Sequence, residues 1–165
     1  MKRYRGLLIV FAVLIVLAGI ICLTLRVTAD YPTLGEPVSY EVNQVEGFEL
    51  SIEEPSWSPF RGYTIRYKIE IDSNDVYYLD NNSKQFEYLE CFTNNQWYRL
   101  NRQGEFAEYN TWDIGGEGNT SFQGSIVQKY DGYGTRLENG LHRLILELTD
   151  QKGQTHYLSA EFNVE

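Results

Sequence analysis

The chain has 165 residues and a formal net charge of −9 at pH 7. Four of its 14 Lys and Arg precede Asp30, whereas all 23 Asp and Glu lie from Asp30 onward, so this part of the chain carries a charge of −13. Such an acidic balance argues against nucleic acid as a partner, because nucleic acids are bound through clustered positive charge. The 136 residues from Asp30 suffice for one domain with its own core.

An uncharged stretch of nineteen residues runs from Leu7 to Leu25. A helix of this length covers roughly 28 Å, which matches the ~30 Å hydrocarbon core of a bilayer. Lys2, Arg3 and Arg5 precede the stretch, whereas only Arg26 follows it closely. We therefore predict a transmembrane helix over residues 7–25 that acts as a signal anchor. It leaves the basic residues 1–6 in the cytoplasm and the C-terminal domain outside the cell, in a single-pass arrangement.

A cleaved signal peptide is the alternative, because Val27-Thr28-Ala29 places small residues where a signal peptidase cleaves. Cleavage after Ala29 would give a secreted protein. The apolar core of a signal peptide is about 7 to 15 residues long, and the longer stretch here favours the uncleaved anchor.

Residues 26–47 are predicted to form an extracellular linker, because Pro32, Gly35 and Pro37 interrupt any pattern and only Val38 to Val42 alternates weakly. From Phe48 onward, apolar and polar residues alternate with a period of two, which indicates half-buried strands. Residues 48–165 are therefore predicted to form one domain. Its predicted strands cover residues 48–52, 63–71, 85–93, 96–100, 121–128, 142–148 and 155–164.

The last two predicted strands form a hairpin whose register follows from its apolar faces. Placing Leu146 opposite Leu158 turns the leucines of both strands to one side and leaves Gln151 to Gly153 as a three-residue loop. Gly153 then occupies the position that needs a positive φ. The same register places the two histidines of the chain, His142 and His156, at opposite ends of the hairpin.

The sequence contains no pattern typical of a catalytic or metal centre. Histidines at opposite ends of a hairpin cannot share a metal ion, and the acidic turn from Asp72 to Asp80 lacks the glycine and the final glutamate of a calcium-binding loop. We therefore predict a non-enzymatic protein without a cofactor or a metal. Only Cys91 lies outside the predicted membrane span, so no disulfide can form within the domain.

Short antiparallel strands and frequent turns favour an all-β fold, an immunoglobulin-like antiparallel β-sandwich preceded by a single N-terminal transmembrane helix. Two motifs support this: Tyr88-Leu89-Glu90 leading through Asn94-Asn95 to Gln96-Trp97, and the segment 137–143, LENGLHR. Through them the chain from about Phe48 to Glu165 resembles bacterial Ig-like domains of membrane-anchored and lipoprotein-type surface proteins of Gram-positive bacteria. His142 stands where that family usually has tyrosine. The resemblance implies fold and surface location, with a binding or spacer role.

The longest irregular stretch of the domain, residues 101–119, carries the candidate binding residues. Phe106, Tyr109 and Trp112 recur there at three-residue spacing. Aromatic residues exposed on loops are typical binding anchors, although these three could instead fold back over the open end of the core. Two functions follow: an extracellular binding or accessory module for a protein or glycan partner, or a structural spacer without a ligand of its own.

Overall fold

The computed structural model describes residues 10–21, 30–79, 86–103, 112–116 and 120–165. The chain divides into two compact units, Met1–Asp30 and Tyr31–Glu165. In the first unit, residues 10–21 form an α-helix with exposed apolar side chains. Within the described ranges, no helix is both long enough and apolar enough to cross a membrane. The two ends of the predicted span, residues 7–9 and 22–25, lie outside these ranges.

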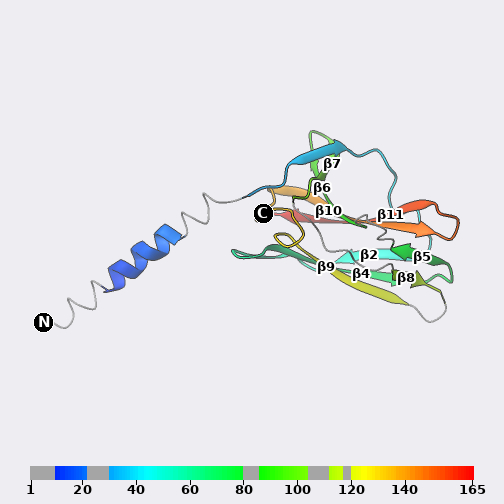
Figure 1. Ribbon diagram of the computed structural model, residues 1–165, viewed down its shortest axis with the longest axis horizontal. Helices are drawn as coiled ribbons and strands as arrows, with labels where there is room; N and C mark the ends of the chain where they lie inside the picture. The colour runs from blue at the N-terminus through cyan, green and yellow to red at the C-terminus, as the bar shows by residue number, and fades with distance from the viewer. Residues whose placement is uncertain (1–9, 22–29, 80–85, 104–111, 117–119) are drawn as a thin grey trace, which may run out of the picture. The chain divides into compact units, whose positions relative to one another are not determined.

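The unit Tyr31–Glu165 consists of antiparallel β-strands in two sheets, which confirms the all-β prediction (Figure 1). In the first sheet, β10 pairs with β11 along one edge and, along the other edge, with β6 and then with β5. Beyond β6 the sheet continues with β7 and then β1. Beyond β5 it continues with β8. The strands of this sheet are β1 (Leu34–Pro37), β5 (Val76–Leu79), β6 (Glu87–Thr93), β7 (Gln96–Leu100), β8 (Trp112–Gly115), β10 (Gly140–Asp150) and β11 (Thr155–Val164).

The second sheet is built on β4. The strands β2 and β3 lie one after the other along one edge of β4, and β9 lies along its other edge. Their bounds are β2 (Phe48–Ile52), β3 (Ser56–Ser58), β4 (Gly62–Ile71) and β9 (Ser121–Val127).

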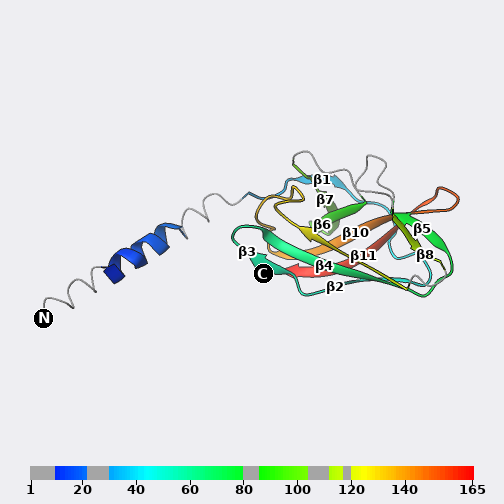
Figure 2. The same ribbon diagram turned by 60° about the horizontal axis from the view of Figure 1, so that its bottom comes forward.

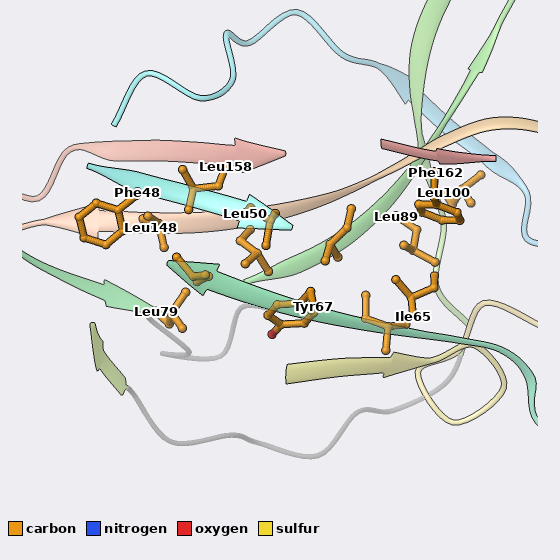
Figure 3. Packing of buried hydrophobic residues seen from close by; sticks show 14 of the residues in the cluster. Phe48, Leu50, Ile65, Tyr67, Leu79, Leu89, Leu100, Leu148, Leu158 and Phe162 are labelled. Carbon is orange, nitrogen blue, oxygen red and sulfur yellow. The ribbon is translucent and has the colours of Figure 1, made fainter. Parts of the chain in front are cut away.

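The core lies between the two sheets and follows the period of two (Figure 3). Along β4, Ile65, Tyr67 and Ile69 are buried, while the residues between them reach the outer face. Burying a side chain of this size contributes about 1.5–3 kcal/mol. Strands β6, β10 and β11 supply the facing layer, with Leu89, Leu144, Leu146, Leu148, Leu158 and Phe162.

The predicted hairpin register is confirmed. Leu146 pairs with Leu158, His142 with Phe162 and His156 with Leu148. Gly153 has a φ of 78° in the loop between β10 and β11. The predicted strands 85–93 and 96–100 also form a hairpin, β6 and β7, in which Asn94 and Asn95 adopt φ values of 51° and 61°, as the tight turn requires.

The sequence prediction was wrong on the shortest strands. It missed β3, β5 and β8, because three or four residues are too few to display an alternating pattern. The weakly alternating residues Val38 to Val42 form no strand; the short strand of this stretch is β1, which contains Gly35 and ends at Pro37. Glycine and proline are tolerated in β1 because it lies at the edge of the sheet.

Residues 38–47, which we call the strap, cross the outer face of the first sheet from β7 to β11. At one end the backbone N–H of Val38 donates to the carbonyl of Trp97, and further along that of Asn43 donates to the carbonyl of Tyr157. Between these points the ring of Tyr40 stacks on that of Tyr157, with 3.9 Å between centroids. The strap therefore belongs to the same compact unit as the sandwich.

A buried tyrosine joins the two sheets at the connection between β9 and β10. Tyr133 is fully buried, and its hydroxyl accepts a hydrogen bond of 3.1 Å from the backbone N–H of Leu89. His142 lies instead against Phe162, and its Nδ1 atom is 3.1 Å from the carbonyl oxygen of Gly140. Tyr133, and not His142, thus bonds the backbone of β6, and we call this contact the Tyr133 corner.

We predict that Tyr133→Phe lowers the free energy of unfolding by about 1–3 kcal/mol, because it leaves the buried N–H of Leu89 without its acceptor. Urea denaturation of the full chain measures this loss. The control is Tyr130→Phe, which makes the same chemical change on an exposed ring and should cost less than about 0.5 kcal/mol. Equal stabilities of the two variants would contradict a structural role for the Tyr133 hydroxyl.

Candidate functional site: an exposed aromatic and cationic end

The structure leaves the predicted binding residues untested. Phe106 and Tyr109 lie outside the described residues. Trp112 is the first residue of β8, where its backbone pairs with Leu79, and its side chain is likewise outside the description. The binding role of these three aromatic residues therefore stays a prediction.

Three other aromatic side chains are exposed at one end of the sandwich. Trp57 is 39 % exposed, Phe60 75 % and Tyr130 67 %. Trp57 lies in β3, Phe60 in the turn between β3 and β4, and Tyr130 in the connection that follows β9. We call this surface the aromatic end; the turn between β3 and β4 projects there (Figure 2).

The buried side chain of Gln128 holds the two segments of the aromatic end together. Its Oε1 atom accepts a hydrogen bond of 3.0 Å from the backbone N–H of Tyr63, and its Nε2 donates to the carbonyl of Tyr133 at 2.8 Å. A backbone hydrogen bond from Lys129 to the carbonyl of Arg61, 3.1 Å long, adds a second link. The exposed rings therefore stand on fixed backbone.

Gly62 makes the close approach of these segments possible. Its φ is +71°, a value that residues with a side chain rarely adopt, and a Cβ atom there would lie 2.5 Å from Oε1 of Gln128. The hydroxyl of Ser58 stabilises the same turn by accepting a hydrogen bond from the N–H of Arg61.

Positive charge accompanies the aromatic rings. The guanidinium of Arg136 lies 4.1 Å from the centre of the Trp57 ring. Arg61 and Lys129, whose backbones are hydrogen-bonded to each other, add two further cationic side chains. Among the described residues, no carboxylate lies within ion-pairing distance of these three cations. By contrast, Arg66, Lys68, Arg99 and Arg143 all contact a carboxylate.

Two acids each lie two residues along the chain from one of these cations, the exposed Glu138 and the half-buried Asp131. The carboxyl of Asp131 is held by its own turn. Its Oδ2 atom accepts a hydrogen bond from the backbone N–H of Val127, and burial raises the pKa of its carboxyl above the ordinary value. The aromatic end thus gathers three cations that are not ion-paired within the described residues, in a unit that is acidic as a whole. Such a surface can bind a partner that combines negative charge with flat or apolar groups.

The buried carboxylate of Glu90 lies in a cluster that serves the fold. Its Oε2 atom accepts hydrogen bonds of 2.8 Å from Nε and Nη2 of Arg143, and its Oε1 accepts one from the hydroxyl of Tyr40. Burial, followed by the contact with Glu90, raises the pKa of Tyr40 well above its usual range. Both oxygens of Glu90 are occupied beneath the strap, so this cluster fastens the strap to the sheet.

A second carboxyl, that of Glu87, lies between the sheets. The hydroxyl of Tyr67, from the opposite sheet, donates a hydrogen bond to it. The pKa of Glu87 is raised to about 7, chiefly by burial; the hydrogen bond from Tyr67 opposes this rise, the nearby Asp131 adds to it and Arg102 opposes it. Gly124 leaves room for the Tyr67 ring, because a Cβ atom there would overlap its hydroxyl. This half-buried contact links the two sheets.

Comparison with known proteins returns no match to this chain among family models, curated proteins or solved structures. The aromatic end must therefore be interpreted from its own chemistry.

One weak signal for the aromatic end is present in the sequence. In Trp57-Ser58-Pro59-Phe60, two large apolar residues flank a turn, where polar residues are usual. Nothing in the sequence brings this turn next to Tyr130, because Gln128 makes that connection across 65 residues of chain. Sequence reasoning favoured the longer irregular stretch for this reason.

We predict that Glu87 makes the domain less stable as the pH rises. Its pKa in the folded state, about 7, exceeds the value of 4.5 for a free glutamate, so the folded state binds the proton more tightly. The resulting stabilisation is complete below about pH 4.5 and is lost as the pH rises through about 7. The loss amounts to at most about 3 kcal/mol.

The measurement is urea denaturation of the wild type and of Glu87→Gln between about pH 5 and 8. Glutamine keeps an acceptor for Tyr67 but cannot titrate. Asp131, with a raised pKa, acts in the same sense as Glu87, whereas His142, whose pKa is lowered by burial, acts in the opposite sense. The difference between the two proteins isolates Glu87, and a difference that does not vary with pH would refute this assignment.

Proposed function

We propose that the chain is a membrane-anchored, non-catalytic surface protein whose Ig-like domain binds a partner through the aromatic end. The observation that carries the proposal is the group of three exposed aromatic rings on fixed backbone, beside cations without a carboxylate partner in the described part of the chain. The anchor, the Ig-like assignment and the binding role each have separate support.

The order of the strands supports an Ig-like assignment. An Ig sandwich places strands A, B and E in one sheet and strands C′, C, F and G in the other. In this unit, β2, β4 and β9 occupy the positions of A, B and E, whereas β7, β6, β10 and β11 occupy those of C′, C, F and G. On this interpretation, β1, β5 and β8 are additions to the common arrangement.

The anchor rests on the sequence from Leu7 to Leu25 and on the basic residues before it. The described residues 10–21 of this stretch are helical, as a membrane span requires. In this arrangement the acidic domain lies outside the cell.

A binding role without catalysis agrees with the use of the buried charged groups. Glu90 is held by Arg143 and Tyr40 under the strap, and Glu87 contacts Tyr67 between the sheets. The aromatic end offers rings and cations but no base or nucleophile in a shared geometry. Its chemistry is that of recognition, and a protein, a glycan or a lipid surface can each present the complementary groups.

We predict that the full chain with a C-terminal epitope, expressed in a bacterial host, stays in the membrane fraction after an alkaline carbonate wash. Protease added to intact cells should remove the epitope, because the domain lies outside. Replacing Leu14 and Val16 with Arg should release the chain from the membrane, since a charge at the centre of a span is costly. A soluble chain whose N-terminus is Asp30 would establish cleavage after Ala29 and overturn the anchor.

We predict that Phe60→Ser combined with Tyr130→Ser changes the free energy of unfolding by less than about 0.5 kcal/mol, because both rings are exposed. Phe162→Ser, the same change in the core, should cost several kcal/mol, on the order of 3–5. Urea denaturation compares the variants. If the Phe60 and Tyr130 variant lost as much stability as the Phe162 variant, the two rings would be stabilising the fold. That result would favour the spacer function.

A further inference from the structure

We propose that the aromatic end docks on the anionic headgroup surface of the bilayer that holds the anchor. This inference rests on the proposed function, because it names the partner of the same site. Three observations lead to it: the short chain between the proposed span and the folded unit, the place where the chain enters that unit, and the chemistry of the aromatic end.

The tether is short because the strap belongs to the sandwich. The compact unit begins at Tyr31, so only residues 26–30 separate it from a span that ends at Leu25. Six steps of extended chain reach roughly 20 Å. A strand of eleven residues such as β10 is itself about 36 Å long. Part of the unit must therefore stay close to the headgroups.

The chain enters the unit beside the aromatic end. The carbonyl of Thr33 accepts a hydrogen bond from the N–H of Asn101, and two residues later Gln103 donates to the carbonyl of Gly132. Gly132 follows Tyr130 in the same turn. Figures 1 and 2 agree that the coil before β1 and the turn between β3 and β4 lie at the same end of the unit. The tether therefore holds this end nearest to the bilayer.

The residues of the aromatic end suit the membrane interface. Tryptophan and tyrosine are enriched at the headgroup level, where an apolar ring and a polar atom are both satisfied. Arg61 and Lys129 provide attraction to anionic headgroups, and no carboxylate among the described residues pairs with them. The acidic remainder of the unit is repelled by the same surface, so the charge distribution orients the unit with this end towards the lipid.

The test uses the full chain reconstituted into vesicles of phosphatidylcholine, with or without phosphatidylglycerol, that contain lipid brominated near the headgroup. Bromine quenches tryptophan emission on contact, and the difference between the wild type and Trp57→Phe gives the signal of Trp57. We expect this signal to fall about twofold in vesicles with phosphatidylglycerol, and to recover when about 0.5 M salt screens the surface charge.

Replacing both Arg61 and Lys129 with Gln should abolish the quenching of Trp57. The matched control replaces Lys68 and Lys152 with Gln, which removes the same charge from the outer face of the second sheet and from the loop between β10 and β11. This control should leave the quenching unchanged. If the two double variants behave alike, the contact depends on net charge alone and the proposed docking surface is wrong.

A carbonate wash of the vesicles separates failure of this inference from failure of the proposed function. Chain lost in the wash was never anchored, which overturns both. Chain that is retained but shows no quenching of Trp57 has its aromatic end turned to the solvent, which overturns docking and leaves that end for a protein or glycan. Quenching that is equal with and without phosphatidylglycerol would overturn recognition of anionic headgroups.

Discussion

The fold depends on the position of β10, which pairs along both edges and is buried on both faces. Its even-numbered leucines fill the core, so Arg143 and Ile145 must point to the outer face, where they are buried as well. Removing a cation from water costs several kcal/mol unless a carboxylate replaces the lost hydration. Glu90, directly opposite on β6, supplies that carboxylate, and the strap closes over the pair through Tyr40.

The strap is part of the folded unit, although the sequence predicts a linker in its place. Its residues show no strong alternation, and Gly35 and Pro37 precede it, so the sequence predicts a linker there. Its contacts join residues far apart: Tyr40 and Glu90 are 50 positions apart, and Asn43 and Ser159 are 116 apart. Local patterns contain no information on such pairs. The same contacts decide how much chain remains free to act as a tether.

The long strands and the two hairpins were predictable because a period of two and turn residues such as Asn94 and Gly153 act locally. The short strands and the Tyr133 corner were not, since each depends on a partner elsewhere in the chain. The same reason separates the predicted site from the aromatic end. Sequence identifies aromatic residues in a loop, whereas their exposure and neighbours depend on contacts between distant segments, such as the one that Gln128 makes with Tyr63.

The aromatic end has features that folding alone does not require. Exposed rings contribute little to the core, and cations in an acidic unit gain attraction when they pair with carboxylates, as Arg66 and Lys68 do. Here the rings and the cations remain exposed on backbone that Gln128 and Gly62 hold in place. A backbone that is already held in place loses little conformational freedom when a partner binds, which favours binding. This combination, exposed groups that add little to stability on a backbone held in place, is the basis of the proposed contact with a partner.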